Sequence, residues 1–395
     1  MKNSRIYLSL AHIGGREQEF IQQAFDTNWV VPMGPNVSGF EQDLVQFLGN
    51  DAQVSALSSG TAALHLGLIL LDVKPDDEVL CQSFTFAASA NPIVYLGAKP
   101  VFVDSERDTW NLSPEHLERA IQDRIAKGKT PKAIIVVHAY GMPAKMDEIR
   151  TIANRHKIPL LEDAASALGS TYKGIHCGTL GELAALSFNG NKIITTSGGG
   201  ALVATHQRIA CKIVGQCPQR NDGNLIKKAR FLATQARDAA PHYQHSQIGY
   251  NYRMSNIVAG IGRGQMLVLP ERIAQRRANN QFYRKHLAGI EGITFQTEPN
   301  SDFYSNYWLT SILIDPEKTN GITRETLRLA LEAANIESRP LWKPMHLQPI
   351  FADCPFYGDG TGEDLFNKGL CLPSGSILTE QDLQRVVKVI KQILV

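Results

Sequence analysis

The chain has 395 residues, of which 43% are hydrophobic and 20% are charged. This length and balance suffice for two globular domains with a sizeable core. Forty basic residues against thirty-eight acidic ones leave a formal net charge of only +2, so the composition argues against a nucleic-acid-binding protein and against one held at an anionic membrane.

The cysteines and the apolar runs bear on metal binding and on compartment. The six cysteines are scattered and include no Cys-x-x-Cys pair, so neither a zinc site nor a redox motif is expected. The sequence has no uninterrupted apolar stretch of the ~20 residues that a membrane-spanning helix requires. The apolar run before Gly14 is too short for an export signal. We therefore expect a cytoplasmic protein that binds no metal and does not associate with membranes.

Strand and helix patterns alternate between about residues 50 and 205. Strands are predicted over residues 53–58, 78–82, 100–103, 132–138, 158–163, 183–188 and 200–204, with helices over 61–71, 87–96, 114–125 and 146–155. This alternation predicts an α/β fold whose mostly parallel sheet is covered by helices on both faces. Ligands of such sheets gather at the carboxyl ends of strands, which is where Gly60, His138 and Asp163 fall.

The remainder of the chain predicts a second, smaller α/β unit. Residues 206–237 are basic and helical in pattern, with a loop signal at 217–224. Helices are predicted over 256–268 and 271–287, separated at Pro270, followed by a strand at 308–314 and helices over 323–334 and 380–393. We place the boundary between a large domain, 1–260, and a small C-terminal domain, 261–395, near residue 260.

Lys192 and Asp163 are the strongest candidates for chemistry. Lys192 lies in a polar loop between an apolar strand and three glycines, 198–200. It could form a Schiff base with a bound aldehyde and carry a proton, although an exposed loop lysine is the commoner case. Asp163 ends a strand and could hold a pyridine nitrogen protonated, cap a helix beginning at Ala164, or do both. Together the two residues suit pyridoxal phosphate.

Gly60 and Thr61 open a predicted helix directly after a strand. Free amide groups and the helix dipole favour a phosphate there, while a tight turn with a Thr cap is the alternative. Ser187 could add a hydroxyl to the same phosphate or satisfy local backbone groups. Glycines 198–200 precede a strand rather than a helix, so we expect them to allow close packing or a hinge.

Two aromatic residues and one histidine follow neighbouring strands. Phe84 or Phe86 could stack on a flat heteroaromatic ring, whereas packing in the core is the commoner fate of a phenylalanine. His138 could contact a ligand, but we expect a core histidine with satisfied ring nitrogens.

These residues stand in motifs that resemble those of the DegT/DnrJ/EryC1/StrS family of nucleotide-sugar aminotransferases. The motifs are Gly-Thr-Ala at 60–62, Glu-Asp-Ala-Ala-Ser at 162–166, Ser-Phe-Asn-Gly-Asn-Lys at 187–192 and Gly-Tyr-Asn-Tyr-Arg-Met-Ser at 249–255. They occur in family order, and the resemblance covers nearly the whole chain. It implies the aspartate aminotransferase-like fold (fold type I), pyridoxal phosphate as cofactor and glutamate as amino donor.

The resemblance also implies a role for each residue. Lys192 would be the Schiff-base lysine, Asp163 the partner of the pyridine nitrogen and Ser166 a contact to the 3-hydroxyl of the cofactor. The phosphate would be held by Gly60, Thr61 and Ser187, and the ring covered by Phe86. Asn251 would reach the phosphate in a neighbouring subunit, with Arg253 beside it, so the resemblance implies a homodimer with shared active sites.

A closer resemblance is to aminotransferases that act on UDP-2-acetamido-4-keto-2,6-dideoxyhexose in bacillosamine-type and exopolysaccharide pathways. It rests on residues 189–200, 243–255, 339–346 and 371–375. The third stretch places Arg339, Trp342, Lys343 and His346 among prolines, a set that could bind a diphosphate and a base or form a surface turn. The predicted function is amination of C4 of this sugar for a bacterial surface glycan.

Three alternatives stay open. Another nucleotide-linked keto sugar, such as the GDP-linked sugar of perosamine synthases, would preserve every cofactor residue. A pyridoxal-phosphate-dependent sugar dehydratase shares the fold, but its family pattern has a histidine where this chain has Lys192. A non-catalytic sugar-binding relative is disfavoured because Asp163 and Lys192 are both present. The loop at 211–226 looks longer than in close relatives, which leaves the substrate more open than the reaction.

Overall fold

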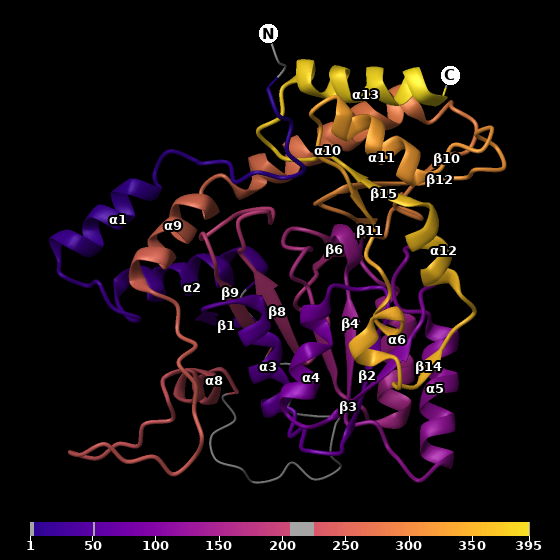
Figure 1. Ribbon diagram of the computed structural model, residues 1–395. Coiled ribbons are helices and arrows are strands. Elements are labelled where there is room, and N and C mark those ends of the chain that lie inside the picture. Colours follow the sequence, from indigo (N-terminus) through magenta and orange to yellow (C-terminus); the bar gives the residue numbers. More distant parts are fainter. Residues whose placement is uncertain (1–3, 50–51, 206–224, 395) are drawn as a thin grey trace.

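A sheet of eight strands forms the centre of the computed structural model, which describes residues 4–49, 52–205 and 225–394 (Figure 1). In spatial order the strands are β1 (Ala52–Leu57), β9 (Gly200–Thr205), β8 (Leu183–Ser187), β5 (Leu160–Asp163), β4 (Ala133–Val137), β2 (Glu78–Gln82), β3 (Lys99–Val103) and β14 (Phe356–Tyr357). The strands from β8 to β14 run parallel, and β9 runs antiparallel between β1 and β8. The predicted mostly parallel sheet is confirmed.

Helices cover both faces of this sheet because its strands are apolar on both sides. In β4, Ile134 and Val136 point into one core cluster, whereas Ala133 and Ile135 point into the other. The first cluster includes residues of α2 (Pro35–Leu48), α5 (Pro114–Ala126) and α6 (Met146–His156). The second includes α3 (Gly60–Leu70), α4 (Asn91–Tyr95) and α8 (Leu225–Ala233). Such double burial is typical of parallel sheets.

The helix predicted over 87–96 is divided in the structure. A short 3-10 helix, η1 (Ala87–Ser89), precedes α4, and Pro92 lies in the first turn of α4. Proline lacks an amide hydrogen and fits the first turn of a helix rather than its interior. The proline therefore starts a new helix instead of continuing the earlier one.

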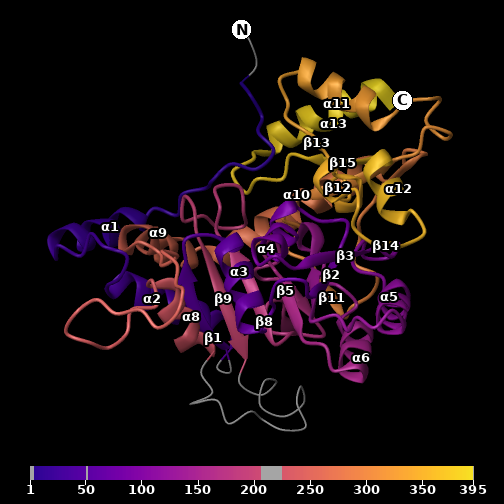
Figure 2. The same ribbon diagram turned by 60° about the horizontal axis from the view of Figure 1, so that its bottom comes forward.

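A second sheet lies at one end of the molecule (Figure 2). Its strand order is β10 (Ile293–Phe295), β12 (Thr310–Ile314), β15 (Gly369–Leu372) and β13 (Arg339–Pro340). Residues of α10 (Leu269–Leu287), α11 (Arg324–Ala333) and α13 (Glu380–Leu394) share its core, which also contains Ile6 from the N-terminal segment. The division of domains at residue 260 stays a prediction.

The remaining elements lie outside these two sheets. Helix α9 (Asn256–Met266) packs against α1 (Glu17–Asp26) and α2, and α12 (Thr361–Lys368) precedes β15. A small sheet joins β11 (Phe303–Tyr304), β6 (Thr171–Tyr172) and β7 (Ile175–His176), and 3-10 helices lie at Ala139–Gly141 (η2), Met345–Leu347 (η3) and Pro349–Phe351 (η4).

The loop predicted at 217–224, and with it most of 211–226, lies outside the described residues. Among the helices of the described ranges, none has the length and apolar character needed to cross a bilayer.

Candidate active site

Lys192 lies in the connection between β8 and β9, and its amine points into the protein. Its Nζ donates a hydrogen bond of 3.0 Å to Ser166 Oγ and lies 4.0 Å from the centroid of the Trp308 ring. The loop is closed at its base, where the Thr196 amide donates to Phe188 O at 2.8 Å. The common alternative, a solvated loop lysine, is therefore wrong.

Burial lowers the pKa of Lys192 to about 8, with the negative charge of Asp163 opposing the shift and the positive charge of Arg276 adding to it. Desolvation disfavours an ammonium because the charged form loses its hydration. A larger fraction of the amine is then neutral near physiological pH, and only the neutral amine can act as a nucleophile or accept a proton.

Asp163, at the carboxyl end of β5, is buried with both carboxylate oxygens partnered. Ser89 Oγ donates to Oδ2 at 2.6 Å and lies 2.7 Å from Thr85 Oγ1, while the Ala165 amide donates to Oδ1 at 3.1 Å. The residues after Asp163 form turns rather than a helix, so the alternative role of Asp163 as a helix cap is wrong. The carboxylate instead closes an Asx-type turn on the amide two residues later.

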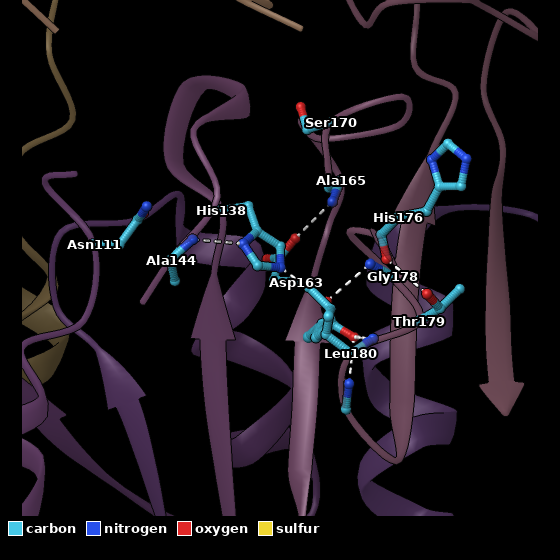
Figure 3. Close-up of polar contacts among 12 residues, drawn as sticks. Asn111, His138, Ala144, Asp163, Ala165, Ser170, His176, Gly178, Thr179 and Leu180 are labelled. Carbon is cyan, nitrogen blue, oxygen red and sulfur yellow. Dashed lines mark hydrogen bonds and ion pairs between the residues drawn. The ribbon is translucent and has the colours of Figure 1, made fainter. Parts of the chain in front are cut away.

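The neighbouring Glu162 anchors the same strand end. Its carboxylate is fully buried and accepts hydrogen bonds from His138 Nε2 at 2.9 Å and from three loop amides at 2.6–2.8 Å, those of Gly178, Leu180 and Gly181. The Ala144 amide donates to the other ring nitrogen of His138, Nδ1, at 3.1 Å (Figure 3). The expectation of a satisfied core histidine is confirmed. Asp163 therefore follows a residue of β5, Glu162, whose buried hydrogen bonds fix the end of the strand.

The N-terminus of α3 lies against the end of β8. The Ser59 side chain caps the helix by accepting from the Ala62 amide at 3.0 Å, so the alternative of a Thr cap is wrong. The first-turn amides of Gly60 and Thr61 have no acceptor within the helix. A Cβ on Gly60 would come within 3.1 Å of Ser187 Cβ, a tight contact that glycine avoids.

Gly200 serves the same close packing. A side chain at this position of β9 would overlap the backbone of Ser59 and Gly60. The expectation that the glycines at 198–200 permit close packing is therefore confirmed for Gly200.

The two candidate phenylalanines have different environments. Phe84 is fully buried and contacts Tyr140 and Trp342 edge-on or at a tilt. Phe86 is 62% exposed at the start of η1. Packing in the core therefore accounts for Phe84, and only Phe86 presents its ring at the surface.

The stretch 339–346 does not present all four of its predicted side chains to a ligand. Arg339 is exposed and pairs with Glu337 at 2.9 Å, and Lys343 is exposed. Both ring nitrogens of His346 have partners within the chain, Ser83 Oγ at 2.7 Å and Glu363 Oε1 at 3.1 Å.

Trp342, the fourth member of this stretch, belongs to an aromatic stack that reaches Lys192. It is half-buried and stacks on Tyr140, with ring centroids 4.2 Å apart. Tyr140 also stacks on Trp308, at 6.3 Å, and the two tryptophan rings lie 6.2 Å apart, so the three rings form a cluster in which Trp308 contacts the amine of Lys192. The stack places an apolar wall beside the amine.

Arg253 and Asn251 lie in the motif at residues 249–255. Arg253 turns inward and donates to Glu41 Oε1 at 2.7 Å and to Ala56 O at 2.9 Å. Its charge is already balanced by a buried carboxylate. Asn251 is exposed. Roles for these two residues toward a ligand stay predictions.

Sequence reasoning missed Ser89 and Trp308. Trp308 stood at the start of a predicted strand, but it lies before β12 and meets Lys192 from a distant part of the chain. Ser89 lies within the helix predicted over residues 87–96. The one available signal was its place in the segment after β2, a strand whose carboxyl end shares the sheet edge with Asp163.

Comparisons with known proteins agree along almost the whole length. The model of the DegT/DnrJ/EryC1/StrS aminotransferase family matches residues 11–391. The chain is 49% identical to EpsN of Bacillus subtilis (strain 168), covering 98% of this chain and 95% of that protein. It is 35% identical to the GDP-perosamine synthase of Caulobacter vibrioides, covering 99% of each.

Among solved structures, the chain resembles a DegT DnrJ EryC1 StrS aminotransferase from Brucella abortus. The TM-score is 0.85 at 28% identity, covering 96% of this chain and 95% of that one. The chain belongs to the DegT/DnrJ/EryC1/StrS aminotransferase family, which confirms the predicted type I α/β fold, the dependence on pyridoxal phosphate and amino-group transfer as the reaction.

Proposed function

We propose that the chain transfers an amino group from glutamate to C4 of a UDP-linked 2-acetamido-4-keto-2,6-dideoxyhexose, in the synthesis of a bacterial surface glycan. The observation that carries the reaction is the Lys192 amine, held between the Ser166 hydroxyl and the Trp308 ring and electrostatically coupled to Asp163. Support for the sugar comes from the motif resemblance and from the identity of 49% to EpsN, against 35% to a GDP-perosamine synthase.

The residues present fit pyridoxal phosphate. The first turn of α3 and Ser187 form a cradle that a side chain on Gly60 would fill, and helix N-termini favour phosphate. The amides of Gly60 and Thr61 and the Ser187 hydroxyl would hold that group. The exposed ring of Phe86 would cover the cofactor, and Ser166 would contact its 3-hydroxyl. When bound, the cofactor supplies an electron sink for the carbon that loses its proton.

The side chains would then divide the work of the reaction. Asp163, kept in place by Ser89 and the Ala165 amide, would hold a proton on the pyridine nitrogen. Lys192 Nζ would take the α-proton of glutamate and later deliver a proton at C4 of the sugar. Because the amine approaches from one side, the new amine at C4 would have one configuration.

For the sugar nucleotide, Trp342, Arg339, Lys343 and Arg253 stay candidate contacts. The exposed cations Arg339 and Lys343 suit a diphosphate and the aromatic face of Trp342 suits a base, whereas Arg253 turns inward to Glu41. His346 is the weakest of the set because Ser83 and Glu363 already occupy its ring nitrogens.

We further propose a homodimer with shared active sites. Figures 1 and 2 both show the segment between α8 and α9 extending away from the rest of the molecule. It carries Tyr243 and Ile248, which are 77% and 83% exposed. Apolar side chains on a protruding arm are typical of an interface. A second subunit would cover them and receive Asn251 near its phosphate cradle.

Subunit complementation tests the shared site. Lys192→Ala and Asn251→Asp chains, each inactive alone, are unfolded together and refolded as a mixture. If one subunit supplies the lysine and the other the asparagine, mixed dimers contain one intact site and regain activity. A mixture as inactive as its components would contradict the shared site.

We also propose the cytoplasm as the compartment. The cysteines described by the structure, Cys81, Cys177, Cys354 and Cys371, are all free thiols. Unpaired cysteines are typical of a reducing compartment.

The second candidate is amination of a GDP-linked keto sugar, favoured by the full-length similarity to GDP-perosamine synthases. UDP- and GDP-linked 4-keto sugars are incubated in parallel with enzyme, pyridoxal phosphate and glutamate, and the products are identified by mass spectrometry and NMR. An amine at C4 of the UDP sugar alone supports the proposal. Turnover of the GDP sugar alone contradicts the nucleotide, and release of water without consumption of glutamate indicates a dehydratase.

A further inference from the structure

Arg276, on α10, is a buried cation without an acidic partner. Its side chain is 1% exposed, and in residues 4–49, 52–205 and 225–394 it forms no ion pair with a carboxylate. Its hydrogen bonds go to uncharged oxygens, and its Nε has no acceptor there. Removing a charge from water without a counter-charge is unfavourable for folding. Stability therefore does not explain this residue.

The contacts of Arg276 lead to the lysine loop. Nη1 donates to Trp308 O at 2.7 Å, and Nη2 donates to Lys192 O at 3.1 Å and to Ser9 Oγ at 3.0 Å. One planar guanidinium therefore joins the main chains of the two residues whose side chains form the amine–indole contact.

A second set of bonds fixes the residue before Lys192. Asn191 O accepts from Ser9 Oγ and from Trp308 Nε1, both at 2.7 Å. The N-terminal segment, the lysine loop and the segment before β12 thus meet around Arg276. Three separate groups donate to the backbone carbonyls of residues 191–192, namely Ser9 Oγ, Arg276 Nη2 and Trp308 Nε1. The third belongs to the indole whose face contacts the Lys192 amine.

We propose that Arg276 is a positioning residue for Lys192: its guanidinium holds the main chains of Lys192 and Trp308 together and so seats the lysine amine on the indole ring. The inference rests on the proposed role of Lys192 in amino transfer. A lysine that leaves the cofactor and returns to it needs a fixed place while its amine is free, and the indole face provides that place.

The charges around the amine have opposite effects. Asp163 and the face of Trp308 favour the ammonium, whereas burial and the unpaired charge of Arg276 disfavour it and lower the pKa of Lys192. The Ser166 hydroxyl can accept a hydrogen bond from the ammonium or donate one to the neutral amine of Lys192, so it favours neither protonation state. Arg276 therefore has two separable effects on Lys192, one through its hydrogen bonds and one through its charge.

The charge is tested on the cofactor-free enzyme. The rate of reductive methylation of Lys192 by formaldehyde and cyanoborohydride is followed by peptide mass spectrometry as a function of pH. We expect Arg276→Gln to raise the midpoint by roughly one pH unit, Arg276→Lys to leave it near that of the wild type, and Trp308→Leu to lower it by roughly half a unit. Arg272→Gln is the matched control, because Arg272 is a buried arginine one turn earlier that pairs with Glu271.

The hydrogen bonds are tested by hydrogen exchange of the peptide containing residues 189–196. Neither glutamine nor lysine can bridge two carbonyls as the guanidinium does. We expect exchange roughly tenfold faster or more in both Arg276 variants and unchanged exchange in Arg272→Gln. If Arg276→Gln does not fold, exchange in Arg276→Lys still decides whether the hydrogen bonds of Arg276 hold the loop.

Unchanged exchange in both Arg276 variants, or an equal acceleration in Arg272→Gln, would overturn the inference. So would a midpoint in Arg276→Gln equal to that of the wild type. Neither measurement uses substrate. If the midpoint and the exchange rate change as expected but the enzyme transfers no amino group, only the proposed function is contradicted. If the enzyme transfers amino groups but neither the midpoint nor the exchange rate changes, only the role of Arg276 is contradicted.

Discussion

Replacing Lys192 with methionine should stabilise the cofactor-free protein even though it removes the proposed catalytic amine. Burial lowers the pKa of Lys192 from its ordinary value of 10.5 to about 8. A shift of one pKa unit corresponds to about 1.4 kcal/mol, so the buried ammonium costs about 3 kcal/mol at neutral pH. Methionine fills a similar volume but loses the contacts with Ser166 and Trp308. We therefore expect a net gain of about 1–2 kcal/mol.

The pH dependence identifies the cause. Between pH 8 and 10.5 the unfolded chain binds the lysine proton and the folded chain does not, so the stability of the wild type rises with pH across this window. Below pH 8 both states bind the proton and the difference from Lys192→Met is constant. The advantage of the variant should therefore be greatest near pH 7 and shrink toward pH 10.5.

Urea unfolding followed by circular dichroism, at several pH values between 7 and 10, measures this difference. Lys173→Met is the control, because Lys173 is an exposed lysine that pairs with Asp147, and this contact raises its pKa rather than lowering it. Its difference from the wild type should not change across the window. A Lys192→Met protein that is less stable than the wild type at pH 7, or whose difference is independent of pH, would refute the reasoning.

Three other substitutions probe the surroundings of Lys192. Glu162→Gln replaces one oxygen of a buried carboxylate that accepts four hydrogen bonds, and should lower the free energy of unfolding by roughly 3–6 kcal/mol. The control Glu182→Gln should lower it by only about 1 kcal/mol, because the Glu182 carboxylate accepts from a single strand amide. Equal urea midpoints for the two variants would contradict this expectation. Ser89→Ala removes the 2.6 Å donor of Asp163 and should destabilise the protein by about 1.5–3 kcal/mol by the same measurement, with no change as the contrary result. Gly60→Ala should weaken binding of pyridoxal phosphate roughly tenfold, because the added Cβ lies 3.1 Å from Ser187 and narrows the phosphate cradle. The helix itself tolerates alanine. An unchanged affinity for pyridoxal phosphate in an absorbance titration would contradict the assigned cradle.

The elements were predictable where their signals are local. The predicted strands over 78–82 and 183–188 match β2 and β8 to within a residue, because apolar runs of that length report burial on both faces. The antiparallel direction of β9 was not stated in advance. It follows from the connection after β8, which contains no helix and therefore cannot return the chain to a parallel start.

The strand β14 was not predicted. It consists of two residues, and it pairs with β3 from more than two hundred and fifty positions along the chain. So short a segment has no periodicity of its own.

The sequence by itself determined the reaction class, because Asp163 and Lys192 stand in short motifs whose residues are adjacent along the chain. Only the tertiary structure decided what surrounds them. Ser89, Trp308 and Arg276 come from distant parts of the chain, and each contacts Asp163 or Lys192 through an interaction that no local pattern encodes. The physical reason is that the sign and size of the pKa shift of Lys192 depend on burial and on charges brought close by folding, whereas the motif specifies only that a lysine is there.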